Sequence, residues 1–467
     1  MRGYVKAGAV LVGAAAVLAG LGFGAFQLMN WHFNPEPPPA GYLKPASALE
    51  AQRQDVEYFD KLIALDKSFP ATGRAEAERR IAALKAMARA LPHQMLAVRL
   101  MQIAALSDNG HTHLRLFDRA RSQLFLPVRV TRFADGFYVM RTRTAHRALL
   151  GGRLEAIDGV PFAEVLKRLE TLRGGLEVFR RENAALYIEE NDLDYGLAIA
   201  KAPDKAAWTV RLPDGRVVTQ MLEAAPLPKD DDLPYGDRWL SPEPHAGMGA
   251  DWMAYKPAAG GAEPPSYRDL DRVFENVAIP GSCARYIRIQ DIIDVDDQKI
   301  MPFLEKTEAE LMANPPCAAI VDLRGNGGGN YTNAWHFGHA LPKIVKGRIV
   351  VLTDADTFSA AITTTAFLKE TAGDRMTIVG EPIGDRLAFF AEGNAGVLPN
   401  LGIGETYETG KHDYGAPCRD IDVCYWLNWL YPVRVKSLQP DVFVPQSFAA
   451  WNAGHDPALD KAVEIAR

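Results

Sequence analysis

The sequence AAIVDLRGNGGGN (residues 318–330) is followed along the chain by RIVVLTDADTFSAA (348–361) and MTIVGEPIGD (376–385). Each segment begins with a run rich in Val and Ile, which is too short and too apolar for a surface helix and is typical of a buried parallel strand. Segments of helical length separate the runs, so the pattern is β-α-β-α-β with right-handed crossovers. Chemistry in such sheets gathers at the carboxyl ends of the strands. We therefore expect an α/β core in which the three turns after the strands share one crevice.

The glycine-rich turn after the first run has two interpretations. The nucleotide-binding pattern Gly-x-Gly-x-x-Gly fails because Asn330 occupies its last position, and no Gly-Lys-Ser/Thr follows. A bare glycine backbone can instead aim N–H groups at a developing oxyanion. Ser359 stands where the next helix should begin, so its hydroxyl and the Ala360 N–H would both lie at the positive end of that helix. Alone, Ser359 would be read as an N-cap; together with the glycine turn, it is a candidate nucleophile.

Two histidine pairs are conceivable metal ligands. His111 and His113 are two residues apart and would share a face of a strand, but no third ligand is spaced to complete a site. His336 and His339 form an i, i+3 pair that usually has no such role on a helix. No metal and no cofactor are therefore expected.

Six motifs together resemble the S41 family of serine peptidases, which includes the C-terminal processing peptidases and the core of the tricorn protease. They are DLRGNGGG, TFSAA, VGEP, LQPDV (438–442), GHDPAL (454–459) and SDNGHT (107–112). The similarity runs from about Leu49 to the C-terminus. It implies the spiral core shared with the Clp protease and crotonase group, and a polypeptide substrate. It also implies that Ser359 is the nucleophile, that His111 is the base, and that the N–H groups of Gly328 and Ala360 stabilise the oxyanion.

The sequence departs from the best-known branch of that family at the general base. C-terminal processing peptidases use a lysine after the Gly-Glu turn, but here Asp385 stands at that place and an arginine follows, which cannot act as a base. Lys369 lies nearly three helical turns beyond Ser359. A Ser–His arrangement like that of the tricorn core remains, although Gly110 replaces the serine that precedes its histidine. The acids available to orient His111 are Glu381, Asp385 and Glu408.

The first segment of the chain predicts a membrane anchor. Two basic residues, Arg2 and Lys6, precede residues 7–29, which carry no charge. A stretch of this length favours an uncleaved spanning helix over a cleaved signal peptide, which is the alternative. The basic side faces the cytoplasm, so the rest of the chain is expected to be periplasmic or otherwise extracytoplasmic, held at the inner membrane. The proline-rich residues 31–48 would form a stiff spacer.

The four cysteines fit an exported protein. Cys418 and Cys424 can close a small loop and Cys283 and Cys317 can form a second pair, with free buried thiols as the alternative. The net charge of −6 gives no sign of nucleic-acid binding.

The remaining chain divides by pattern. Residues 49–115 are helical, 116–225 are β-rich with a PDZ-like fragment at 152–159, 226–270 read as a loop or insertion, and 271–467 form the catalytic core. The expected function is an exported serine peptidase that works through an acyl-enzyme. The alternatives are a catalytically inactive binding protein on the same fold, as in interphotoreceptor retinoid-binding protein, or an esterase that uses the same Ser and His. The absence of Gly-x-Ser-x-Gly around Ser359 argues against an α/β-hydrolase.

Overall fold

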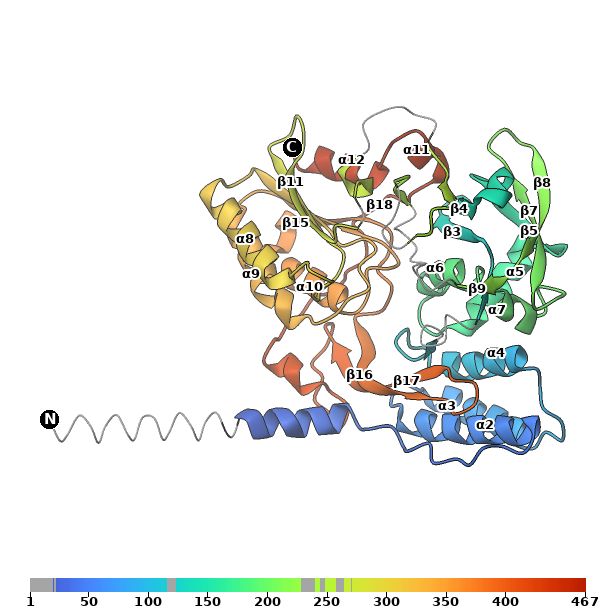
Figure 1. Cartoon of the computed structure of the whole chain (residues 1–467). Helices are drawn as coiled ribbons and strands as arrows, with labels where there is room; N and C mark the ends of the chain where they lie inside the picture. Colours follow the sequence, from blue (N-terminus) through green and yellow to red (C-terminus); the bar gives the residue numbers. More distant parts are fainter. Residues whose placement is uncertain are drawn as a thin grey trace, which may run out of the picture.

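The computed structural model describes residues 20, 22–115, 123–227, 240–243, 248–257, 264–269 and 271–467. Within them, a six-stranded core sheet is covered by helices on both faces, a second sheet lies beside it, and a layer of N-terminal helices lies below (Figure 1). The expected α/β fold class is confirmed, and its parts are described in turn below.

The core sheet has the strand order β11-β12-β13-β14-β15-β18, with all pairs parallel except that of the edge strand β11. The three strands predicted from the apolar runs are β13 (Ala318–Asp322), β14 (Ile349–Thr353) and β15 (Met376–Gly380), and nearly all of their residues are buried. The remaining strands are β11 (Phe274–Ala278), β12 (Ala284–Ile289) and β18 (Val442–Phe443).

Helices cover the two faces because successive strand residues point to opposite sides. Val321 and Val351 pack with α8 (Ile300–Ala313), α9 (Thr332–Ile344) and α10 (Ala360–Ala372) on one face. Ile320 and Val350 pack with α12 (Pro457–Ile465) on the other. The helix expected directly after Ser359 is α10.

The middle region contains more helix than its sequence predicted. Its main sheet comprises β3 (Val128–Phe133), β4 (Gly136–Arg143), β5 (Arg153–Ile157), β7 (Lys205–Arg211) and β8 (Val217–Glu223). Three helices also lie there: α5 (Phe162–Leu169), α6 (Glu177–Tyr187) and α7 (Asn191–Gly196). The segment 226–270, which was expected to be a loop, supplies β10 (Trp252–Ala254). This strand pairs antiparallel with residues 141–143 at the end of β4, where its backbone groups find hydrogen-bond partners.

The N-terminal layer consists of α2 (Ala48–Leu65), α3 (Ala71–Lys85) and α4 (His93–Ala104). Ser47 caps α2 by accepting a hydrogen bond from the Glu50 N–H.

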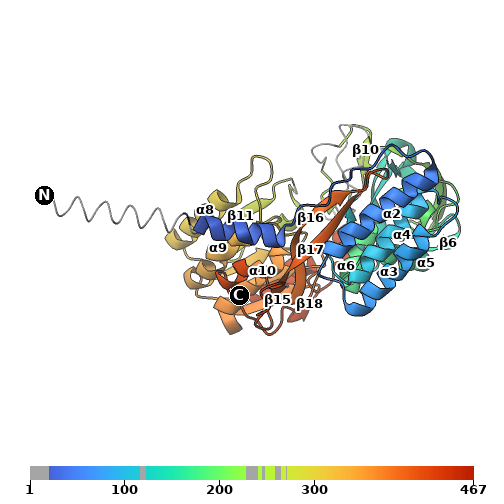
Figure 2. The ribbon, with the colours of Figure 1, turned by 90° about the horizontal axis from the view of Figure 1, so that it is seen from below.

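A long hairpin of β16 (Ala388–Val397) and β17 (Gly404–Asp413) runs from the core to these helices, as Figures 1 and 2 show. β17 pairs with β1 (Leu114–Arg115), which follows the histidine segment after α4. The hairpin therefore ties that segment to the core.

The N-terminal segment is packed against the protein, whereas residues 31–48 were expected to be a stiff spacer between membrane and domain. Residues 22–33 are helical, the Phe33 side chain is fully buried, and the Tyr58 hydroxyl donates to the Pro38 carbonyl at 2.7 Å. Phe33 docks because it meets the aromatic rings of Tyr425 and Trp426. No helix within the described residues is long and apolar enough to cross a membrane, and most of the predicted span 7–29 lies outside them.

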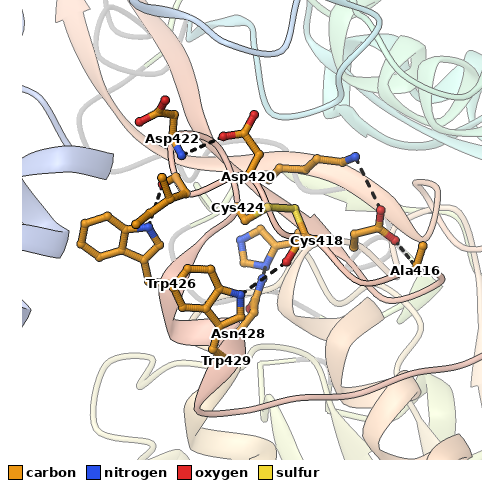
Figure 3. Close-up of a disulfide and its surroundings, with 12 residues drawn as sticks. Ala416, Cys418, Asp420, Asp422, Cys424, Trp426, Asn428 and Trp429 are labelled. Carbon is orange, nitrogen blue, oxygen red and sulfur yellow. Dashed lines mark hydrogen bonds and ion pairs between the residues drawn. A yellow bond between two sulfur atoms is a disulfide. The ribbon is translucent and has the colours of Figure 1, made fainter.

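Both predicted disulfides are present. Cys283 bonds to Cys317 and Cys418 bonds to Cys424, which leaves none of the four cysteines free. The second bond closes the loop shown in Figure 3.

Candidate active site

The three turns at the carboxyl ends of β13, β14 and β15 meet, as the sequence predicted. Four backbone donors link them: the N–H of Gly325 to Asp354 Oδ2 (2.9 Å), of Phe358 to the Asn326 carbonyl (3.0 Å), of Glu381 to the Thr353 carbonyl (2.9 Å), and of Gly384 to the Thr357 carbonyl (3.0 Å). The motifs that suggested a peptidase therefore form one bonded unit.

Ser359 adopts a backbone conformation that is rare for a residue with a side chain. Its φ is +52° and its ψ is −121°, and α10 begins at the next residue. Its hydroxyl makes no N-cap bond and no other hydrogen bond to a residue that the structure describes. The capping interpretation is therefore not supported. A strained serine with an unbonded hydroxyl at a strand-to-helix turn is the arrangement of a nucleophile elbow, reached here without the Gly-x-Ser-x-Gly sequence.

Gly328 lies directly against Ser359. Its φ is +112°, and a Cβ at this position would come within 2.6 Å of the Ser359 Cβ. Its N–H donates to the Asn326 side-chain oxygen at 2.9 Å. Asn326 is fully buried, and its own amide donates to the Ile289 carbonyl at 2.7 Å. The Gly328 N–H is thus near the candidate nucleophile but already engaged, and Asn326 holds the glycine turn in place.

The Ala360 N–H is the freer of the two predicted oxyanion donors. It makes no hydrogen bond within the described part of the chain and stands at the first position of α10. The orphan N–H groups and the dipole at a helix N-terminus favour negative charge. This end of α10 can therefore receive an oxyanion next to the Ser359 hydroxyl.

His111 lies in a column of stacked side chains that includes Phe358, the residue before Ser359. Its ring is stacked between Phe358, at 4.3 Å between centroids, and Phe389, at 5.3 Å. Phe179 stacks on the far side of Phe358 at 4.3 Å, and His412 stacks beyond Phe389 at 5.2 Å. Phe358 is the neighbour of Ser359 in the chain, so the column brings the predicted base to the segment that carries the predicted nucleophile.

Neither ring nitrogen of His111 is hydrogen-bonded to any described residue, and both are shielded from water. Burial lowers the pKa of His111 to about 3, and the nearby His412 and Arg173 act in the same direction. The imidazole is therefore neutral at ordinary pH, and in these surroundings it is a weaker base than a solvated imidazole. It makes no hydrogen bond to Ser359 in this resting arrangement.

His113 points elsewhere. Its ring Nδ1 lies 2.7 Å from the His111 carbonyl oxygen, and its backbone N–H donates to the Thr406 hydroxyl at 2.9 Å. The two histidines that the sequence could not separate by spacing thus have different surroundings, and only His111 joins the column.

The three acids considered as partners of His111 differ in position. Glu381 forms an ion pair with Arg132 at 2.6 Å, and Glu408 lies beside Asp66, which accepts a bond from its N–H at 3.0 Å. Asp385 is almost fully buried; its Oδ1 accepts a hydrogen bond from the backbone N–H of Arg386 at 2.8 Å, and its Oδ2 has no hydrogen-bond partner among the described residues. Burial raises the pKa of Asp385 to about 6. Its neighbour Arg386 donates to the Asp108 carbonyl at 3.0 Å, so Asp385 is linked to the segment that carries His111 through Arg386 and not through the ring.

The other candidate residues are engaged elsewhere. The Lys369 ammonium donates to the Met376 carbonyl at 3.1 Å and lies 3.5 Å from Asp441. His336 pairs with Glu308, and His339 contacts the Trp335 carbonyl. Among the described residues, no group of three His, Cys, Asp or Glu side chains is arranged to hold a metal.

The middle region also contributes to the site, which the sequence did not reveal. Arg173 donates twice to the Gly110 carbonyl, at 3.1 and 2.8 Å, and its guanidinium lies over the Phe179 ring. A Cβ on Gly174 would come within 2.8 Å of the Asn109 N. The segment 173–179 therefore packs against the backbone just before His111. The Arg-Gly-Gly sequence at 173–175 was a signal, since paired glycines mark close backbone approach.

A cavity opens beside the site at the carboxyl ends of the core strands. Core and middle regions both line it, through residues that include Thr131, Arg132, Glu182, Gln290, Asp354 and Glu381. Arg132 forms ion pairs across it with Glu182 and Glu381. Neither Ser359 nor His111 lines this cavity.

Comparison with known proteins shows the fold. No protein-family model matches the chain, and no curated protein sequence is significantly similar to it. Among solved structures, mature CPAF complexed with lactacystin matches with a TM-score of 0.58 and 14% identity, covering 90% of this chain and 98% of that chain. A second structure of mature CPAF matches with a TM-score of 0.55 and 13% identity, covering 89% and 96% of the two chains. The photosystem II D1 C-terminal processing protease aligns over 89% of this chain at 15% identity, but its TM-score of 0.35 is too low to carry weight.

Proposed function

We propose that this chain, which shares its fold with mature CPAF over nearly its whole length, is a serine peptidase of the S41 type. The observation that carries the proposal is Ser359, whose backbone is strained, whose hydroxyl is unbonded, and which stands at the start of α10 against Gly328. Polypeptide is the substrate class implied by the motif resemblance, and no cofactor enters the chemistry.

The reaction follows from the groups around Ser359. Its Oγ attacks the carbonyl carbon of a peptide bond while His111 accepts the hydroxyl proton. The carbonyl oxygen becomes an oxyanion that accepts a hydrogen bond from the Ala360 N–H. When the oxyanion collapses, the C–N bond breaks and the imidazolium protonates the leaving amine, which leaves an acyl ester on Ser359. His111 then accepts a proton from the water that attacks this ester and returns it to the Ser359 oxygen as the ester bond breaks.

Two adjustments accompany substrate binding in this proposal. His111 and Ser359 come within about 3 Å, since catalytic hydrogen bonds are often long in ligand-free enzymes and tighten in the complex. The Gly328 N–H turns from the Asn326 oxygen, or shares its hydrogen with it, to become the second oxyanion donor. Arg173 holds the Gly110 carbonyl and thereby positions the base, and Asp385 supports the same segment through Arg386, which bonds to Asp108. Glu381 acts indirectly, through its ion pair with Arg132.

The proposal places the enzyme outside the cytoplasm, anchored in the inner membrane by residues 7–29. Its support is the uncharged N-terminal stretch after two basic residues, together with two disulfides, which persist in oxidising compartments. The mature chain is expected in the membrane fraction. Recovery of the intact chain from the cytosol would contradict this placement.

Covalent labelling by a fluorophosphonate tests the nucleophile. The wild-type chain should be labelled, Ser359→Ala should not, and Ser437→Ala, which removes a serine hydroxyl far along the chain, should be labelled normally. Absence of labelling in a folded wild-type chain would favour a binding protein on this fold. Digestion of a peptide library, compared with hydrolysis of simple esters, then separates a peptidase from an esterase.

A further inference from the structure

Exposed apolar side chains gather where the N-terminal helix meets the loop closed by the Cys418–Cys424 disulfide. We call residues 418–430 the tryptophan loop. On it, Ile421, Trp429 and Leu430 are 60%, 51% and 72% exposed, and Trp31 at the end of the helix is 73% exposed. Side chains of this size normally lie in the interior, so a group of them marks an interaction surface.

The helix and the tryptophan loop are joined as one unit. His32 stacks on Trp426 with ring centroids 5.1 Å apart, and its Nε2 lies 3.0 Å from the Asp422 carbonyl oxygen. Phe33, which is fully buried, packs edge-on against Trp426. The two segments therefore keep a fixed relation, and each carries exposed apolar side chains within a few residues of this junction.

The loop is also held internally, as Figure 3 shows. The Trp426 indole N–H donates to the Ile421 carbonyl at 2.8 Å, and the Trp429 indole N–H donates to the Cys418 carbonyl at 3.5 Å. Asn428 anchors the loop to the core by accepting a bond from the Tyr331 hydroxyl at 2.8 Å. The exposed Trp429 ring is thus presented by a cross-linked loop, and its N–H group is bonded within that loop.

The chain continues from this surface into the uncharged residues 7–29, and Phe23, Phe26 and Leu28 on the described part of that helix are more than half exposed. We propose that the tryptophan loop and Trp31 rest on the lipid bilayer at the membrane–water interface, as a second contact beside the anchor. Tryptophan is enriched at that interface because one part of the ring is apolar and the other is polar. This contact rests on the proposed anchor but is independent of the proposed chemistry.

The character of the contact follows from its charges. Exposed Asp420 and Asp422 are offset in part by exposed Arg419 in the same loop, so the surface carries no strong charge of either sign. Binding therefore depends on apolar insertion, and it is expected to change little between neutral and anionic lipids or with salt.

The test uses the full-length chain in phosphatidylcholine nanodiscs that contain a spin-labelled lipid. All four native cysteines are in disulfides, so one introduced cysteine can carry a fluorophore. Labels at Leu430→Cys and Trp31→Cys should be quenched several-fold more than a label at Val217→Cys, a 53% exposed position on β8. A label at Phe23→Cys reports on the anchor itself.

The outcomes separate the proposals. Quenching at 23 without quenching at 430 overturns the second contact while leaving the anchor in place. Absence of quenching at both positions overturns the anchor and the contact together, whereas fluorophosphonate labelling of Ser359 judges the chemistry separately. A label at 430 that is shielded but unquenched would show a protein partner or a second copy in place of lipid. If the second contact exists, the double variant Trp429→Ser/Leu430→Ser should reduce the quenching of a label at position 31 and leave fluorophosphonate labelling of Ser359 unchanged.

Discussion

Ser359 keeps a conformation that costs about 1–3 kcal/mol for a residue with a side chain, so its surroundings must impose it. Backbone hydrogen bonds on both sides of Ser359 fix this conformation. The Phe358 N–H donates to the Asn326 carbonyl, and the Ser359 carbonyl accepts the first bonds of α10. Gly328 fills the remaining space at its Cβ. The strain is therefore a property of the glycine turn and the helix together.

Gly328→Val should reduce turnover strongly. A side chain there would need a φ of +112° and would overlap the Ser359 Cβ, so it displaces both the nucleophile and one oxyanion donor. Losing one such donor typically costs about 10²–10³ in turnover. The measurement is the rate of peptide hydrolysis and of fluorophosphonate labelling. Gly327→Ala is the matched control, because no atom lies within 4 Å of a Cβ at that position. A folded Gly328→Val chain with full activity would exclude Gly328 from the site.

His111→Ala should abolish labelling of Ser359, while His113→Ala should leave most of it, because only His111 lies in the column with Phe358. An activity that survives in His111→Ala, or that is lost only when Lys369 is replaced, would identify a different base.

The pH profile gives a second test of the base. A solvated imidazole would lose activity as pH falls through roughly 6 to 7. Burial lowers the pKa of His111 to about 3, so protonation of the free enzyme, and with it the loss of kcat/KM, is expected only below about pH 5. Phe389→Ala would admit water to one face of the His111 ring and raise the pH at which kcat/KM begins to fall. A wild-type limb at pH 6–7 would show that His111 is solvated in the working enzyme.

At the scale of elements, the sequence predicted what local patterns determine. The β13, β14 and β15 strands and the start of α10 follow from apolar runs and breaker residues, and the short spacing of Cys418 and Cys424 allowed their bond, whereas the second cysteine pair had free thiols as an equal alternative. The contribution of α6 could not be predicted in this way. Phe179 and Glu182 reach the site only because the middle region folds back over the core, a contact between segments far apart in sequence. The packing of the N-terminal segment was unpredictable for the same reason, since Phe33 is buried by rings near the other end of the chain.

Arg173→Met should lower kcat more than it changes KM. The guanidinium holds the Gly110 carbonyl by two bonds and lies over Phe179, so its loss frees the backbone before His111 without altering a substrate contact. A displacement of about 1 Å in a catalytic group can cost about 10²-fold. Steady-state kinetics are the measurement. Arg181→Met, whose partly exposed side chain pairs with Glu170 and Glu177, is the control.

Arg173→Lys distinguishes positioning from charge. A lysine keeps the positive charge but lacks the planar fork that makes both bonds, so rescue should be partial. Full activity in Arg173→Met, or equal losses in Arg173→Met and Arg181→Met, would show that Arg173 supports the fold and not the base.

At the scale of the whole molecule, the site is assembled where three regions converge. The core supplies Ser359, the segment after the N-terminal helices supplies His111, and the middle region supplies Arg173. Resemblance to the family motifs was enough to indicate Ser359 and His111. The paired glycines after Arg173 indicate a close backbone approach, but the segment that they approach is set by packing between regions and is not encoded in a local pattern. Assembly from three regions explains why most of the chain is needed around a small set of reacting groups.

The stability of the whole molecule should depend on pH through Asp194. This residue of α7 is fully buried, and neither carboxylate oxygen has a hydrogen-bond partner among the described residues. Burial, with a smaller effect from the nearby Asp158, raises the pKa of Asp194 well above its usual 3.8. The folded chain therefore keeps the group protonated, whereas the unfolded chain ionises it. Its contribution to stability is present below pH 3.8 and is lost as the pH rises toward the folded pKa.

Asp194→Asn keeps the shape of the side chain and cannot ionise. Its melting temperature should therefore exceed that of the wild type by an amount that grows from pH 4 to pH 8, because only the wild type bears the increasing cost of holding a proton. Thermal unfolding followed by circular dichroism measures this difference. Asp214→Asn, in an exposed turn between β7 and β8, should show no such growth with pH. A difference between Asp194→Asn and the wild type that stays constant across this range would mean that Asp194 is ionised, and compensated, in the folded chain.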